Sequence, residues 1–422
     1  MLTLALLREK TEDVKKGLAV KNFNQPELVD EIIKLDDDRK ALQRDRDEAQ
    51  MQMNKASKEI GAAFKSGDKA KAEELKAETA KLKEDIKALS EKHDAALEAM
   101  NKKLILLPNM PHSSVKPGKS EEDNENIHQE GEIPEFSFKA LPHWEITERH
   151  DIIDFELGNK ITGAGFPVYK GKGAKLQRAL ISFFLDRATE AGYLEIQPPL
   201  VINEDSGYGT GQLPDKDGQM YAIPEDKLFL IPTAEVPVTN IYRNVMLKED
   251  ELPKKNTAYS ACFRREAGSY GKDVRGLNRL HQFDKVEIVQ IVHPEKSYEV
   301  LEEMREHVAG LLRELKLPFR ILRLCGGDTS FTAALTYDFE VFSAAQKRWL
   351  EVSSVSNFES FQANRMKLRF KDKEGNTSLL HTLNGSALAL PRILASLLEN
   401  YQTESGVIIP EVLIPYTRFD EI

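Results

Sequence analysis

The stretch CFRREAGSYGKDVRGLNRLHQFDKVE, residues 262 to 287, gathers positive charge in a chain whose formal net charge is −10. It opens with Arg264, Arg265 and Glu266 and continues into a glycine-punctuated basic segment that contains Lys272. On an extended strand, Arg264 and Glu266 would point to the same face. Because a guanidinium fork matches the oxygens of a phosphate or a carboxylate, the pattern predicts a mobile basic loop that binds an anion. A surface hairpin with solvated charges is the competing interpretation.

The composition indicates a globular protein of two or three domains, with 422 residues of which 30% are charged and 41% hydrophobic. No apolar run approaches the ~18–20 residues that cross a bilayer. The start, MLTLALLREKTEDV, lacks the basic region of a signal peptide. Cys262 and Cys325 cannot form a disulfide framework or a cysteine-rich zinc site. We therefore expect a cytoplasmic protein without membrane contact, whose acidic balance restricts nucleic-acid binding to local patches.

The N-terminal hundred residues show the heptad spacing of two packed helices. One ladder of seam positions starts at Ile32 and a second of similar length starts at Leu75, each with steps that alternate between three and four. KSGD, residues 65–68, has the composition of a turn between them. The pattern predicts an antiparallel helical hairpin over about 28–104, about 50 Å long at ~1.5 Å per residue.

Charge near the turn suggests what the hairpin does. Several seam positions are polar, so the hairpin is weakly apolar, and a coiled-coil dimer rod or spacer is the simplest alternative. Residues 51–71 nevertheless hold five lysines against Glu59 and Asp68, a local balance of +3. A hairpin that is basic only near its tip favours contact with a polyanion.

Composition changes after the hairpin. Prolines, glycines and acidic residues mark a linker, and beyond it helical stretches such as 173–193 alternate with strand-like ones such as 285–292. This alternation predicts an α+β domain built on a mainly antiparallel β-sheet flanked by helices. The expected boundaries are 1–106 for the helical domain, 107–130 for the linker and 131–422 for the second domain.

Three other segments suit a nucleotide site. EVSSVSN (351–357) places a glutamate and serines near a strand, an oxygen donor set suited to Mg²⁺ held with substrate phosphates. TLNGSALALPR (382–392) places a glycine in a strand-to-helix passage and Arg392 about two turns further on. A helix N-terminus and an arginine both favour a triphosphate. AGYLEIQPPLVI (191–202) leaves a helix through Gly-Tyr and enters an extended segment with two prolines.

In this order the segments resemble the motifs of the class II aminoacyl-tRNA synthetases. The Gly-Tyr helix end with Pro199 resembles motif 1, FRRE (263–266) resembles motif 2, and the segment ending in Arg392 resembles motif 3. TGQLP, PTAEVP and TLNGSALA are similar to the bacterial type of seryl-tRNA synthetase. The N-terminal hairpin looks like the tRNA-binding arm of that family, so the resemblance covers essentially all of the chain.

The resemblance implies an ATP-dependent serine–tRNA ligase that works as a homodimer through motif 1. L-serine and ATP would give seryl-adenylate and pyrophosphate, and serine would then pass to the 3′ end of tRNA(Ser) and, where one exists, of tRNA(Sec). Mg²⁺ bound with ATP is the expected cofactor. Zinc is not expected, because no Cys/His set resembles the zinc site of the unusual archaeal enzymes. The expected partners are ATP, serine, tRNA and a second copy of the chain.

The resemblance also implies roles for single residues. Arg264 matches the arginine that bridges the serine carboxylate and the α-phosphate, Glu266 the carboxylate beside the adenine amino group, and Arg392 the γ-phosphate clamp; these three are the expected catalytic residues. The expected serine-binding residues are Thr233, Ala234, Glu235, Arg264, Glu287 and Ser386. The expected ATP-binding residues are Arg264, Arg265, Glu266, Leu280, Phe283, Glu351, Val352, Ser353, Ser354 and Arg392, of which Glu351 and Ser354 would hold the metal.

One departure from the family pattern affects these roles. Motif 3 usually carries more glycine, whereas this chain has Pro391 directly before Arg392. Proline fixes the backbone and removes a donor, so it is harmless in the first turn of the helix and would tilt Arg392 deeper in.

Two other functions fit part of the sequence. A relative that makes an adenylate but acylates a non-tRNA acceptor, such as a carrier protein, would lack the long hairpin. A non-catalytic RNA-binding or scaffold protein on a decayed synthetase fold would lose its charged site residues first. This chain keeps all of them, namely Arg264, Glu266, Glu287, Glu351 and Arg392. The ligase interpretation requires these five side chains to gather in one pocket.

Overall fold

The computed structural model describes residues 1–267 and 275–422 and divides into two compact units, residues 1–108 and 109–422. The middle of the predicted basic loop, with Lys272, lies outside the described residues. Among those described, no helix combines the length and the apolar character that crossing a bilayer requires.

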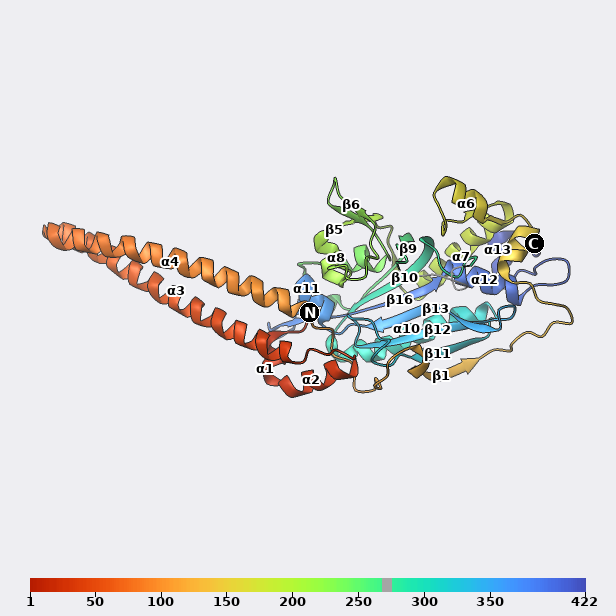
Figure 1. Ribbon diagram of the computed structural model, residues 1–422, viewed down its shortest axis with the longest axis horizontal. Helices are drawn as coiled ribbons and strands as arrows, with labels where there is room; N and C mark the ends of the chain where they lie inside the picture. Colours follow the sequence, from red (N-terminus) through yellow and green to blue (C-terminus); the bar gives the residue numbers. More distant parts are fainter. Residues whose placement is uncertain (268–274) are drawn as a thin grey trace. The chain divides into compact units, whose positions relative to one another are not determined.

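The first unit is helical. Its elements are α1 (Leu4–Glu9), α2 (Thr11–Val20), α3 (Glu27–Ser66) and α4 (Lys69–Leu104). α3 and α4 lie side by side as an antiparallel pair (Figure 1). Gly67 ends α3 with φ at +79°, and the Asp68 side chain caps α4 by accepting a 3.1 Å hydrogen bond from the Lys71 backbone N–H. The predicted helical hairpin is therefore confirmed.

Burial in the hairpin follows the two heptad ladders. Ile32, Ala56 and Ala63 are buried on α3, and Leu75 and Met100 are buried on α4, whereas most positions between the ladder residues are exposed. The seam leaves the basic side chains near the turn in solvent. The exposed lysines there are Lys55, Lys58, Lys65, Lys69 and Lys71.

A buried carboxylate ties the hairpin base to the first helix. Asp36 has no exposed side-chain surface and forms ion pairs with Arg8 at 2.7 Å, Arg39 at 2.8 Å and Lys40 at 3.0 Å. Burial alone would raise the pKa of Asp36, but the hydrogen bonds from Arg39, Lys40 and Arg8 outweigh it and lower that pKa to about 2. Arg39, a seam position, therefore has a specific buried partner.

The second unit is built on an eight-stranded sheet with the order β1-β11-β12-β13-β16-β10-β9-β4 (Figure 1). In that order the strands are Glu125–Glu130, Phe319–Arg323, Leu335–Ser343, Arg348–Asn357, His381–Ala389, Gln282–Val292, Lys254–Phe263 and Leu194–Glu195. Neighbouring strands are antiparallel except for β4 and β9, which are parallel. This confirms the predicted α+β fold with a mainly antiparallel sheet.

Three long helices pack against this sheet. They are α7 (Gly171–Glu190), α10 (Ser297–Glu314) and α12 (Leu390–Asn400). The shorter helices are α5 (His143–Arg149), α6 (Phe155–Ile161), α8 (Glu204–Thr210), α9 (Glu235–Asn240), α11 (Phe361–Met366) and α13 (Ile414–Thr417). Small sheets are formed by β2 (Ile153–Asp154) with β3 (Val168–Tyr169), by β5 (Val201–Asn203), β7 (Leu228–Leu230) and β6 (Ala222–Ile223), and by β15 (Thr377–Leu379), β14 (Arg369–Lys371) and β8 (Met246–Lys248).

Strand β10 lies in the interior of the large sheet, and most of its length is buried on both faces. Val286, Ile288 and Ile291 have no exposed surface, as expected for a continuous apolar strand. Lys285 and Glu287 interrupt this run and are also buried. Because burying a charge is costly without a partner, the two buried charged residues indicate a functional site on this strand.

Candidate active site

A buried polar cluster surrounds Glu287 on β10. Its carboxylate is 1% exposed, accepts a 2.8 Å hydrogen bond from the Thr233 hydroxyl and forms an ion pair with Lys285 on the same strand. Ser386 of β16 is the residue directly across from Glu287. The structure thus brings together three of the expected serine-binding residues.

A second carboxylate lies beside the first. Glu235 is the first residue of α9, directly after the buried Ala234, and its backbone N–H donates to the Thr233 hydroxyl at 3.2 Å. The Gln362 side chain donates a 2.7 Å hydrogen bond to its carboxylate. Burial, followed by the charge of Glu287, raises the pKa of Glu235 to about 7. Two buried carboxylates, Glu235 and Glu287, are therefore connected through Thr233.

Arg264 follows the end of β9 and continues its pairing with the β10 side of the sheet. Its backbone N–H donates to the His281 carbonyl at 2.9 Å, and its Nε donates to the Pro232 carbonyl at 3.3 Å. The guanidinium carbon lies 5.1 Å from the centre of the Phe283 ring. Arg264 and Phe283 are therefore adjacent. The hydrogen bond to the Pro232 carbonyl also places Arg264 next to the residue that precedes Thr233.

The next two residues depart from the predicted strand geometry. β9 ends at Phe263, and Glu266 has a positive φ of +50°, so the expectation that Arg264 and Glu266 share one strand face is wrong. The Arg265 guanidinium lies 5.8 Å from the Tyr221 ring centre, and Glu266 forms an ion pair with Arg279. The strand therefore ends three residues before Glu266, and the chain turns toward the basic loop from there.

A bulge in β13 decides where Glu351 and Ser354 point. In an uninterrupted strand, residues three apart face opposite sides. Here Ser354 pairs with Asp338 and Glu351 pairs with Glu340, with a register shift between them. Asp338 and Glu340 are two apart on β12, so their partners Glu351 and Ser354 share one face. Only a β-bulge makes the expected metal pair geometrically possible.

The donor set around the bulge suits a divalent cation carried by a nucleotide. Glu351 is about half exposed, and one buried carboxylate oxygen of Asp338 has no hydrogen-bond partner. Burial, followed by the charge of Glu351, raises the pKa of Asp338. Within the described part of the chain, no cluster of three His, Cys, Asp or Glu side chains could hold a metal by itself. Phosphate oxygens would have to complete the coordination, as they do for Mg²⁺.

Strand β13 connects the expected serine-binding residues with the expected ATP-binding residues. Val352 is buried, and the Ser353 hydroxyl donates a 2.6 Å hydrogen bond to the Ser386 carbonyl. Arg392 donates from Nη1 to the Glu351 carbonyl at 2.6 Å, and its Nη1 is 3.5 Å from the Glu351 carboxylate. Its Nε donates to the Asn278 carbonyl at 3.0 Å, two residues before the buried Leu280.

The path into α12 differs from the sequence expectation. Gly385 lies inside β16 rather than in a strand-to-helix passage, and the stretch from Gly385 to Arg392 is mostly strand, with Arg392 as the third residue of α12. Pro391 is the second residue of the helix, a position that tolerates proline. Leu388 has φ at +93°, a region that favours glycine, at the register shift opposite Lys285 and Glu287. Leu388 therefore holds a backbone conformation that a glycine would adopt without strain.

Sequence reasoning missed several polar residues of this region. Lys285 could have been found, because a lysine two residues from a glutamate inside an apolar run is unusual. Gln362 and Asn278 carried no signal, because their partners lie 127 residues away at Glu235 and 114 residues away at Arg392.

Comparison with known proteins gives matches that extend over the whole chain. A model of the seryl-tRNA synthetase N-terminal domain matches residues 1–111, and one of the tRNA synthetase class II core domain (G, H, P, S and T) matches residues 221–401. A serine–tRNA ligase of Salinibacter ruber is 51% identical over 425 residues, which cover 100% of this chain and 99% of the relative. The chain belongs to the seryl-tRNA synthetase family. A second member of this family, from Chlorobium phaeovibrioides, is 46% identical over 100% of this chain and 99% of its own.

Solved structures of seryl-tRNA synthetases agree with the fold. The crystal structure of seryl-tRNA synthetase from Pyrococcus horikoshii complexed with ATP has a TM-score of 0.93 at 33% identity, covering 100% of this chain and 99% of that one. The cytoplasmic serine–tRNA ligase of Naegleria fowleri in complex with AMP has a TM-score of 0.88 at 25% identity, covering 100% and 98%. The family predicted from the motifs is confirmed.

Proposed function

We propose that this chain activates L-serine with ATP and transfers it to the 3′ end of tRNA(Ser), and of tRNA(Sec) where one exists. Full-length similarity to serine–tRNA ligases establishes an ATP-dependent ligase of this type. The observation that carries the residue-level proposal is the buried carboxylate pair, Glu235 and Glu287, beside the guanidinium of Arg264. A small amino acid with an ammonium and a hydroxyl group supplies the donors that these carboxylates need.

The serine pocket consists, in this proposal, of Glu235 and Glu287 with Thr233, Ala234 and Ser386. Glu235 and Glu287 accept hydrogen bonds from the serine ammonium and hydroxyl groups. The Thr233 hydroxyl donates to the Glu287 carboxylate and accepts from the Glu235 backbone N–H, so it orients the first carboxylate and holds the main chain at the second. Arg264 holds the serine carboxylate. Alanine would leave a buried acceptor unpaired, which discriminates against it strongly.

Adenylate formation then needs positioning and charge neutralisation rather than a covalent group from the protein. The serine carboxylate attacks the α-phosphate, and Arg264 bridges the two so that the developing negative charge has a fixed partner. The Phe283 ring stacks on adenine, and Glu266 accepts from its amino group. Arg265 and the backbone near Leu280 complete the nucleotide contacts.

The phosphates of ATP are held at the opposite end of the site. Arg392 binds the γ-phosphate, and Glu351 and Ser354 would hold Mg²⁺ on the face created by the bulge, with Val352 and Ser353 shaping the strand below. When bound, the metal neutralises phosphate charge and orients the pyrophosphate leaving group. The half-exposed Glu351 and the unpartnered Asp338 oxygen support this placement.

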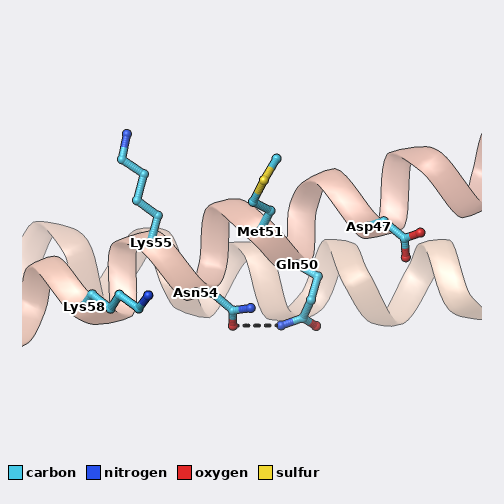
Figure 2. Close-up of a pocket in the computed structure, with 6 residues that line it drawn as sticks. All are labelled: Asp47, Gln50, Met51, Asn54, Lys55 and Lys58. Atoms are coloured by element: carbon cyan, nitrogen blue, oxygen red, sulfur yellow. Dashed lines mark hydrogen bonds between the residues drawn. The ribbon is translucent and has the colours of Figure 1, made fainter.

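The hairpin supplies the tRNA contact in this proposal. Figure 2 shows a surface depression on α3 whose lining comes from one helix and includes Lys55 and Lys58, with Met51 and Lys55 pointing away from the helix. Gln50 donates to Asn54 within the same surface at 3.2 Å. Exposed lysines on a helix are suited to phosphate contacts that carry no sequence information. None of the expected serine or ATP residues lies in this depression.

A homodimer through motif 1 is part of the same proposal. Leu194 lies on β4, the last strand of the large sheet, and is 66% exposed. An exposed leucine at a sheet edge favours association with another chain.

Aminoacylation of purified tRNA with serine, cysteine and alanine tests the proposal. Serine-dependent exchange of pyrophosphate into ATP and charging of tRNA(Ser) are expected with serine. Charging of a carrier protein but not of tRNA would favour the non-tRNA alternative.

A further inference from the structure

A histidine and a glutamate outside the serine and ATP groups form a buried pair between α5 and α12. His143, the first residue of α5, and Glu399, near the end of α12, both have side chains without exposed surface. The His143 backbone N–H donates to the Glu399 carboxylate at 3.0 Å, and ring Nδ1 lies 2.7 Å from the same oxygen. Ser343 and Gln346 also donate to this carboxylate.

The other ring nitrogen of His143 faces the return of the basic loop. The Leu277 backbone N–H donates to Nε2 at 2.8 Å. Nε2 must therefore be the acceptor, which leaves Nδ1 as the donor to Glu399 and fixes a neutral ring in one tautomer. Gly276 makes the approach possible, because a Cβ atom there would lie 2.2 Å from Nε2 and because its φ is +66°.

Asn278 links the contacts of His143 to Arg392. The Asn278 carbonyl, one residue after Leu277, accepts the 3.0 Å hydrogen bond from Arg392 Nε. The Asn278 side chain donates to Gln346 at 3.1 Å, and Gln346 donates to Glu399 at 2.9 Å. The contacts therefore form a closed ring of hydrogen-bonded groups that contains both ends of α12 and the two residues after Gly276.

We propose that His143 is a positioning residue for ATP binding, which acts by fixing the Asn278 carbonyl that orients Arg392. The inference rests on the proposed function, in which Arg392 binds the γ-phosphate. Glu399 holds the ring, and the ring holds Leu277. The carbonyl of the next residue accepts from Arg392 Nε and so fixes the orientation of the guanidinium. A purely structural pair would stabilise α5 on α12 without affecting one substrate more than another.

Two substitutions separate these roles, because each deletes one of the two ring contacts. In His143→Asn the amide nitrogen takes the place of Nδ1 and keeps the Glu399 contact, but nothing accepts from Leu277. In His143→Gln the amide oxygen reaches the place of Nε2 and accepts from Leu277, but the Glu399 contact is lost. Both variants lose one buried hydrogen bond, so similar losses of thermal stability are expected.

Serine-dependent pyrophosphate exchange with the full chain measures the KM values for ATP and serine. We expect His143→Asn to raise the KM for ATP about fivefold to tenfold, the size of effect that one ordinary hydrogen bond supports. His143→Gln should restore much of that loss, and the KM for serine should change less than about twofold in both. His307→Asn is the matched control, since His307 is a half-buried histidine on α10.

A double-mutant cycle with Arg392→Ala tests whether the effect passes through Arg392. In that background His143→Asn should no longer change the KM for ATP. Equal changes in the ATP and serine KM values, or an ATP effect that survives in Arg392→Ala, would overturn the proposal. If His143→Asn does not fold, Asn278→Ala decides: it removes the Gln346 contact and must raise the KM for ATP alone. Absence of exchange in the unmodified protein would instead contradict the proposed function.

Discussion

Arg392 donates a 2.6 Å hydrogen bond to the backbone carbonyl of Glu351, so the arginine at the start of α12 is tied to the bulged strand that carries the proposed metal ligands. The second contact of its guanidinium, 3.0 Å from Nε to the Asn278 carbonyl, reaches the return of the basic loop. One side chain of the segment that resembles motif 3 therefore contacts both the bulged strand and the return of the basic loop. A nucleotide bound there would contact both through a single guanidinium.

Arg264→Ala should abolish adenylate formation. Removing a preorganised charge from the α-phosphate is expected to lower the rate of serine-dependent pyrophosphate exchange at least about 100-fold. Arg264→Lys should remain impaired, because a lysine keeps the charge but loses the fork. Arg149→Ala, at an exposed position of α5, is the control. Near-normal exchange in Arg264→Ala would refute the role of this arginine.

Glu235 should make stability depend on pH in a defined window. The ordinary pKa of a glutamate is 4.5 and burial raises that of Glu235 to about 7, so between these values the folded state keeps a proton that the unfolded state has lost. The free energy of unfolding should therefore fall as pH rises from about 4.5 to about 7, by about 3 kcal/mol, and then level off.

Urea unfolding of the native chain and of Glu235→Gln across pH 4.5 to 8 isolates this contribution. The difference between the two proteins cancels the titrating groups that do not interact with Glu235. Parallel curves would show that Glu235 titrates at its ordinary value in the folded state.

Gln362→Met should weaken serine binding without affecting ATP. The Gln362 amide donates to Glu235 at 2.7 Å, and its oxygen accepts from the Thr382 hydroxyl at 2.7 Å, which fixes its orientation. Without that donor Glu235 loses its fixed position, so the KM for serine should rise about tenfold. Gln290→Met is a matched control, because Gln290 is an equally buried amide on β10 that donates to Tyr193. An equal rise in that control would attribute the effect to general destabilisation.

Shortening the hairpin across residues 40–95 should separate the two half-reactions. Serine-dependent pyrophosphate exchange should persist, because the serine and ATP groups all lie beyond residue 108. Charging of tRNA should be lost, and reversing the charge of Lys55 and Lys58 should raise the KM for tRNA and reduce its salt dependence. Equal loss of both activities would show that the hairpin has only a structural role.

Leu194→Asp should dissociate the proposed homodimer. A carboxylate at the exposed edge strand would be buried without a partner in the interface, so sedimentation should shift from dimer to monomer. Ile161→Asp on α6 is the control, because Ile161 is 69% exposed and does not belong to the edge strand β4. A monomeric native chain, or a dimer that tolerates the aspartate, would exclude this interface.

The hairpin was predictable because its seam positions repeat with heptad spacing, and this spacing can be recognised in the amino-acid sequence. The large sheet was predictable in class, because runs such as 285–292 are apolar and short. Side-chain directions at the site were not predictable: Glu266 leaves the strand, and Glu351 and Ser354 share a face only because the partner strand shifts register. Such features are set by residues far away in the chain, as are the buried partners of His143.

The bulge at Val352 has a consequence for the length that β13 can have. The extra residue converts an odd spacing into an even one, so the shared face of Glu351 and Ser354 depends on the register of β13 against β12. Deleting Val352 would remove the bulge and place Ser354 two positions after Glu351 in a regular strand, so both oxygen ligands would still lie on one face. Loss of residue 352 should therefore keep the two ligands together, whereas the insertion of one residue without a further bulge would separate them.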